Sequence, residues 1–83
     1  MDGMAATLAT AALGSRVRVD AVEAEHATRR RLAELGIRPG MRVDVLSPTS
    51  GGGRVVAVSE ARIALDRATA AGVTVTPAPE VAA

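Results

Sequence analysis

The sequence contains no cysteine, no lysine and no aromatic residue. Without cysteine, the chain can form neither a disulfide nor a thiolate metal site. Without lysine, it cannot build a Walker-type phosphate-binding loop or form a Schiff base with a substrate. Without Phe, Trp or Tyr, it lacks both the stacking surfaces of single-strand nucleic-acid binders and the aromatic grooves that bind proline-rich peptides. These absences exclude several common enzyme and binding classes.

Long hydrophobic runs are also missing, since no apolar stretch approaches the ~20 residues of a membrane span. The first residues include Asp2 and no basic segment, so we expect no secretory signal. The net charge is only +1, and arginines and acids are interspersed along the chain. Such a distribution is unlike the one-sided basic surface of nucleic-acid binders. We therefore expect a cytoplasmic protein with no nucleic-acid partner and no direct insertion into the membrane.

The 83 residues leave room for one small domain. Apolar and polar residues alternate in several short segments, a pattern typical of half-buried strands. The predicted strands cover residues 16–22, 41–46, 54–59, 62–65 and 73–76. The sequence thus predicts a mainly β domain over residues 7–76, with disordered ends at 1–6 and 77–83. A closed or nearly closed barrel of about five strands is favoured, because closure hides strand edges.

One short helix is predicted over residues 23–36, with Leu32 and Leu35 on its buried side. Its end has the pattern of a Schellman motif. If Gly36 adopts the left-handed conformation, Leu32 and Ile37 occupy the two positions that make the hydrophobic contact of that motif.

Two further turns are predicted around this helix and after the fourth strand. Pro39 stops the helix from resuming, and residues 38–41 fit a type II turn with Gly40 at the position of positive φ. Near the end of the chain, Asp66 can cap a single helical turn that Gly72 ends.

Three consecutive arginines, Arg29, Arg30 and Arg31, lie on the predicted helix. At about 100° per residue they sweep about 200° and cannot all point at one ligand. Arg31 flanks the buried side, whereas Arg29 and Arg30 face water or a partner. A solvated helix face is the first interpretation, a protein contact that also includes Arg38 is the second, and nucleic-acid binding is the third.

His26 is the only histidine, and Glu23 and Glu25 precede it. These residues are the weak candidates for a metal site, which usually draws on more ligands held by a rigid scaffold. The alternative is a polar approach to the helix, whose N-terminus favours acidic residues. We expect no resident cofactor, with transient binding of a divalent metal as the alternative.

The sequence offers no catalytic constellation. There is no Cys, Lys or Tyr, and the serines lie in turns or at strand ends with no base in prospect. The stretch SGGGR, residues 50–54, lacks both the spacing of a phosphate-binding loop and a following helix. We therefore expect that the protein is not an enzyme.

The run RRRLAELGIRPGMRVDVL, followed by RIALDRATAAGVTV, resembles the FeoA family. Members of this family are small cytoplasmic proteins with an SH3-like barrel that accompany the ferrous-iron transporter FeoB. The barrel is also similar to the C-terminal domain of DtxR-type iron-dependent repressors, but this chain is too short for the DNA-binding and metal domains found there. The motif positions in this sequence are Arg31, Leu32, Leu35, Gly36, Pro39 and Gly40.

The resemblance implies a non-enzymatic accessory protein of ferrous-iron uptake that docks on a FeoB-type transporter, but it does not indicate which face binds. Arg29, Arg30 and Arg38 are our own candidate contacts. Three alternatives remain open at this point. The chain could be a metal-sensing domain, a protein-interaction module unrelated to iron, or a donor of an arginine finger to the nucleotide domain of the transporter.

Overall fold

The computed structural model describes residues 6–78. The predicted disordered ends fall largely on residues 1–5 and 79–83, which lie outside this range. The folded sheet is slightly longer than the predicted 7–76, because Ala6 belongs to its first strand and Pro77 to its last. A backbone hydrogen bond from the N–H of Ala78 to the carbonyl of Arg16 extends the ordered structure by one more residue.

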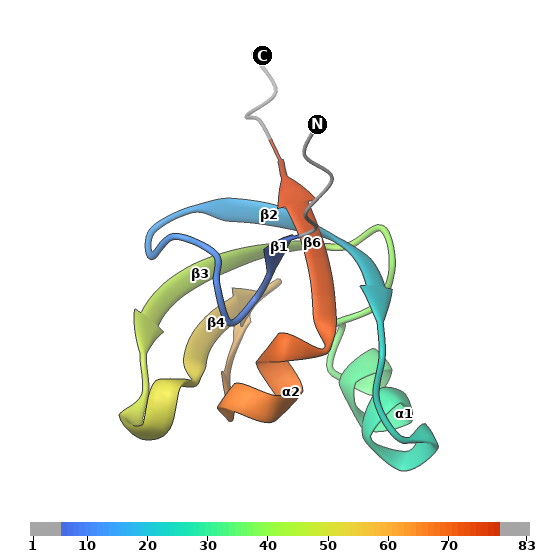
Figure 1. The fold of residues 1–83 in the computed structure, drawn as a ribbon. Helices are drawn as coiled ribbons and strands as arrows, with labels where there is room; N and C mark the ends of the chain where they lie inside the picture. Colours follow the sequence, from blue (N-terminus) through green and yellow to red (C-terminus); the bar gives the residue numbers. More distant parts are fainter. Residues whose placement is uncertain (1–5, 79–83) are drawn as a thin grey trace.

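Six strands form one antiparallel sheet in the order β1-β6-β2-β3-β4-β5 (Figure 1). The strands are β1 (Ala6–Thr7), β2 (Arg16–Val22), β3 (Arg42–Pro48), β4 (Arg54–Val58), β5 (Ala61–Leu65) and β6 (Val73–Pro77). Two α-helices, α1 (His26–Glu34) and α2 (Arg67–Ala71), and a 3-10 turn, η1 (Ser50–Gly52), complete the described chain. The mainly β prediction is confirmed. The additional strand, β1, has two residues, too few for an alternating pattern to be detected.

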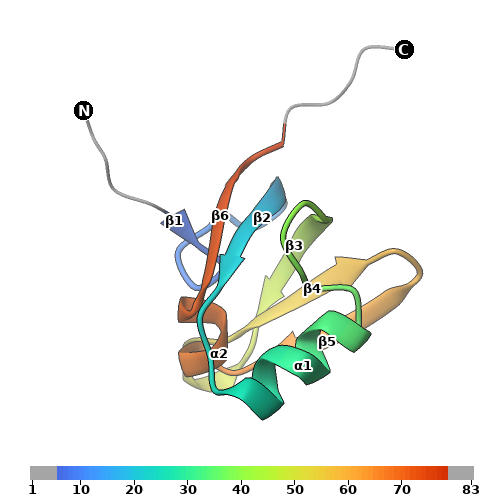
Figure 2. The same cartoon turned by 90° about the vertical axis from the view of Figure 1, so that its right-hand side faces the viewer.

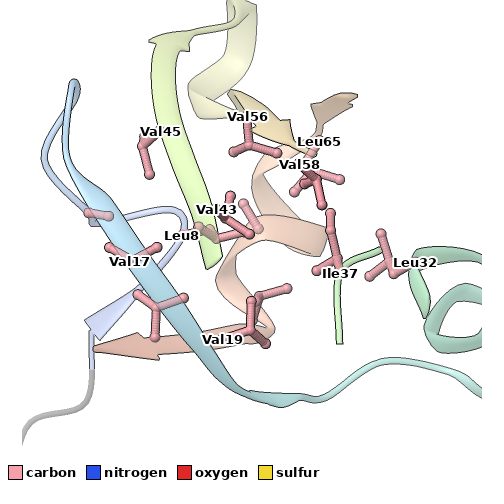
Figure 3. Packing of buried hydrophobic residues seen from close by; sticks show 14 residues of the cluster. Leu8, Val17, Val19, Leu32, Ile37, Val43, Val45, Val56, Val58 and Leu65 are labelled. Carbon is pink, nitrogen blue, oxygen red and sulfur yellow. The ribbon is translucent and has the colours of Figure 1, made fainter. Parts of the chain in front are cut away.

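The sheet curves around an aliphatic core (Figure 3). Alternate residues of the strands face inward, as the sequence predicts for Val17 and Val19 and for Val43 and Val45. Register shifts in β2, between Val19 and Ala21, and in β3, beyond Val45, bend these strands. The buried residues are Leu8, Ala11, Val17, Val19, Leu32, Ile37, Val43, Val45, Val56, Val58, Leu65, Ala70, Val73 and Val75.

Helix α1 begins at His26, three residues later than predicted. The delay has a local cause, since the N–H of Glu23 donates to the carbonyl of Gly72 and ties this residue to the start of β6. The prediction that Leu35 is buried was wrong, because its exposed fraction is 43%. Leu32 is the one buried residue of α1. Ile37, which follows the helix end, is fully buried in the same core.

The helix ends in the predicted Schellman motif. Gly36 has a φ of 102°. The N–H of Ile37 donates to the carbonyl of Leu32 at 2.8 Å, and that of Gly36 donates to the carbonyl of Ala33 at 3.0 Å. These are the two hydrogen bonds of the motif. Figure 3 shows Leu32 beside Ile37, where the motif places its hydrophobic contact.

The type II turn that follows is also confirmed. The N–H of Met41 donates to the carbonyl of Arg38 at 3.1 Å, and Gly40 has a φ of 94°. Pro39 lies at the second position of this turn, where its fixed φ is favourable. The two consecutive turns reverse the chain from α1 into β3.

Asp66 caps α2 as predicted. Its Oδ1 accepts the N–H of Thr69 at 2.7 Å. This hydrogen bond stabilises the carboxylate and lowers the pKa of Asp66 below its ordinary value of 3.8. Gly72 ends the helix in a right-handed conformation, so the left-handed region is not what requires glycine here. A Cβ at this position would collide with the carbonyl oxygen of Glu23.

We expect the substitution Gly36→Val to lower the free energy of unfolding by more than about 1 kcal/mol, because a β-branched residue is strained in the left-handed region. A Cβ at this position would also lie 2.8 Å from Cγ1 of the buried Val58. Urea denaturation measures the effect, with Arg30→Ala as an exposed control on the same helix that should be nearly neutral. Equal losses for the two variants would contradict the assigned helix ending.

We expect the substitution Asp66→Ala to destabilise the protein at neutral pH. The folded-state pKa of Asp66 is lowered, so its contribution is fully present above its ordinary pKa of 3.8. It is lost as the pH falls through the folded-state value. Urea titrations of both proteins at a series of pH values between neutral and strongly acidic measure the difference. A difference that stays constant over this whole range would show that the charged cap does not contribute.

Candidate protein-docking site

The outer surface of α1 carries two of the predicted contact residues, Arg29 and Arg30, and both are exposed. The Nε of Arg30 lies 3.9 Å from Oε2 of Glu34, and its side chain is 72% exposed. A pair of this kind on a helix surface contributes only a few tenths of a kcal/mol. Within residues 6–78, no ion pair involves Arg29. Both guanidinium groups can therefore reach a partner without breaking a strong interaction.

Arg38 lies in the turn after α1 and folds back toward the helix. One of its terminal nitrogens donates to the carbonyl of Ala33 at 3.5 Å. Cations near the C-terminus of a helix interact favourably with its last carbonyls. This contact holds Arg38 at the C-terminal end of α1. Arg29 and Arg30 form the basic surface of α1, and Arg38 lies on the corner that follows the helix.

A groove runs between α1, β5 and α2, and sequence reasoning did not identify it. Figure 2 shows α1 lying across the end of the sheet that β5 forms. The cavity volume is about 380 Å³. Its lining consists of Thr28, Arg31, Leu32, Leu35, Ile63, Ala64, Leu65, Asp66 and Thr69. The four helical positions follow the spacing i, i+3, i+4 and i+7, so they form one stripe along α1. From this spacing, the helical wall of the groove could have been predicted from the sequence.

The groove is lined by aliphatic side chains and by one arginine whose guanidinium has no partner among the described residues. Leu32 and Ile63 belong to the core or pack against it, and Leu35 projects at the helix end. The carboxylate of Asp66 already accepts the N–H of Thr69. The guanidinium of Arg31 has no hydrogen bond or ion pair to any residue between 6 and 78. An aliphatic ligand that also carries a negative charge would fit this lining.

The candidate metal ligands lie at the start of α1. His26 and both glutamates are exposed. Glu25 occupies the N-cap position, but its side chain makes no capping hydrogen bond, and the first turn of the helix holds no acidic residue. Within the described chain, no group of three or more His, Cys, Asp or Glu residues lies close enough to hold a metal ion. The structure does not bring Glu23, Glu25 and His26 together as a ligand set.

The helices of the described part of the chain are short. None of those between residues 6 and 78 is long and apolar enough to cross a membrane.

Comparison with known proteins gives consistent matches to one family. The model of the FeoA domain matches residues 6–77. The solution structure of FeoA from Chlorobium tepidum is 33% identical, with a TM-score of 0.80 over 87% of this chain and 70% of that one. A comparison with curated proteins found no match.

Two crystal structures are also similar. One is FeoA from Stenotrophomonas maltophilia in complex with zinc, described as an SH3 domain protein. It is 34% identical, with a TM-score of 0.73 over 87% of this chain and 91% of that one. The other is an iron uptake regulatory protein (FeoA), which is 26% identical, with a TM-score of 0.76 over 87% of this chain and 96% of that one. The predicted SH3-like fold is thereby confirmed, and this chain belongs to the FeoA family.

Proposed function

We propose that this protein is a non-enzymatic cytoplasmic accessory protein of ferrous-iron uptake that docks on a FeoB-type transporter. The observation that carries the proposal is its membership of the FeoA family over residues 6–77. The similar S. maltophilia protein is described as a candidate activating factor for bacterial ferrous-iron transport. An accessory role also agrees with the composition, which offers no nucleophile–base pair and no lysine.

The basic surface of α1 supports docking through charge. Arg29 and Arg30 are exposed and carry at most a weak ion pair, so little is lost when they turn to a partner. Arginine is enriched among the residues that dominate interface energetics, because its planar guanidinium can bind a carboxylate with two parallel hydrogen bonds. An acidic surface on the cytoplasmic side of the transporter would be the complementary partner.

We expect the double substitution Arg29→Glu/Arg30→Glu to weaken binding to the detergent-solubilised FeoB-type transporter of the same organism by about tenfold. Biolayer interferometry measures the affinity, and urea denaturation should show unchanged stability. Arg42→Glu/Arg67→Glu is the matched control, since it makes the same charge change at two exposed residues that lie outside α1 and do not line the groove. Unchanged affinity of the α1 variant would remove these arginines from the interface.

Direct binding of a divalent metal is the second candidate, favoured by the zinc complex of the S. maltophilia protein. We propose instead that this chain has no resident metal. Its histidine and the two neighbouring glutamates are exposed and do not form a ligand cluster within residues 6–78. Anaerobic calorimetry with Fe²⁺ and with Zn²⁺ should give no heat of binding below millimolar concentrations. Micromolar binding that His26→Ala abolishes would replace the accessory proposal with a metal sensor.

A further inference from the structure

The described sheet has two edges, and one of them is long enough to accept another strand. In the order β1-β6-β2-β3-β4-β5, β1 and β5 each have only one neighbour. The edge strand β1 has two residues, whereas β5 has five. An edge strand presents a row of unpaired N–H and C=O groups, which can pair with another chain. The free side of β5 is therefore the principal unpaired backbone of the sheet between residues 6 and 78.

The register identifies which backbone groups point outward. Val58 pairs with Ala61 across a two-residue loop, and Val56 pairs with Ile63. The pair next to a two-residue hairpin loop is hydrogen-bonded, and bonded and non-bonded pairs then alternate along the strands. Ala61, Ile63 and Leu65 thus direct their N–H and C=O groups toward β4. Arg62 and Ala64 direct theirs toward the free edge.

This free edge faces the groove beside α1. Three consecutive residues of β5, from Ile63 to Leu65, line the groove together with the helical stripe. Successive side chains of a strand point to opposite faces of a sheet, so a cavity lined by consecutive residues must lie against the strand edge. We infer that the outward N–H and C=O groups of Ala64 point into the groove, whose opposite wall is α1.

We propose that this groove binds an extended acidic and aliphatic segment of the transporter as an additional strand on β5. The segment would pair with the backbone of Arg62 and Ala64. Its alternate apolar side chains would lie against Leu32, Leu35 and Ile63. This inference rests on the proposed docking function and specifies how docking occurs.

Two arginines at the groove, Arg31 and Arg62, favour a partner with acidic side chains beside them over a second copy of this chain. The one carboxylate of the lining, Asp66, accepts the N–H of Thr69 at the other end of the groove wall. The guanidinium of Arg31 has no ion pair or hydrogen bond within residues 6–78, and Arg62 is exposed on the edge strand itself. A second β5 on this edge would bring its own Arg62, and its α1 would bring another Arg31, close to the same two residues. Like charges that face each other across an interface cost several kcal/mol. An acidic segment would instead neutralise Arg31.

The test is quenched hydrogen-exchange NMR of the ¹⁵N-labelled chain, free and bound to the detergent-solubilised FeoB-type transporter of the same organism. In the complex, the amides of Arg62 and Ala64 should exchange at least about tenfold more slowly than in the free chain. The amides of Ala61, Ile63 and Leu65 are internal controls, because they are already paired with β4 and should change much less.

A second experiment uses a backbone variant to distinguish hydrogen bonding to the edge of β5 from burial of that edge by the partner without hydrogen bonds. Proline at position 64 removes an outward N–H without removing a bond to β4. Ala64→Pro should weaken binding by about fivefold to tenfold, as for one lost hydrogen bond. Ala64→Ser keeps the N–H at the same position and should change the affinity by less than about twofold on the same scale. If the proline variant does not fold, the exchange measurement on the unmodified chain decides.

The outcomes distinguish this inference from the function on which it rests. Binding of the transporter with unchanged exchange at Arg62 and Ala64 would overturn strand addition and leave the docking function intact. Absence of binding would overturn both. Slow exchange of these two amides in the free chain, together with a dimeric mass, would assign the edge to a second copy and overturn the inference.

Discussion

The backbone reversal at Gly36 determines where α1 lies, and the groove depends on that placement. Leu32 is the one buried residue of the helix, so the sheet holds α1 through this side chain and through the corner that follows it. The left-handed φ of Gly36 and its close approach to Val58 leave no room for a side chain at this position. The direction of α1 over β5 is therefore fixed by a local backbone constraint rather than by an extensive interface.

The aliphatic composition suits the strong curvature of the sheet, which nevertheless stays open between β5 and β1. The largest fully buried side chains are those of Leu8, Ile37 and seven valines, which fill a small volume compared with aromatic residues. A narrow core of this kind suits a strongly curved sheet whose strands are bent by bulges at β2 and β3. The curvature brings the strands around the core without pairing β5 with β1. The edge of the five-residue strand β5 remains available, and the charge of Arg62 limits unwanted association along it.

Local features of the fold could be predicted from the sequence because their hydrogen bonds span only a few residues. The Gly36 ending, the turn at residues 38–41 and the Asp66 cap are all of this kind. The exposure of Leu35 could not be predicted, because its spacing from Leu32 is correct for a buried position and only the tertiary path of Ile37 displaces it. The groove and the free edge were missed for the same reason. They arise from the placement of α1 against β5. The spacing along α1 encodes only the helical wall of the groove, and no local pattern encodes the wall that β5 and α2 form.

Strand addition in the groove would couple the two surfaces of α1 that the docking proposal uses, because Leu32 is the one buried residue of this helix. The arginines at positions 29 and 30 lie on its outer surface, while Arg31 and Leu35 line the groove. A strand in the groove would cover Leu35 and add a second apolar contact between α1 and the sheet. A ligand that binds only one arrangement of an element stabilises that arrangement. Occupation of the groove would therefore also hold the outer arginines in place for the partner, so a short segment and a charged surface can act as one site.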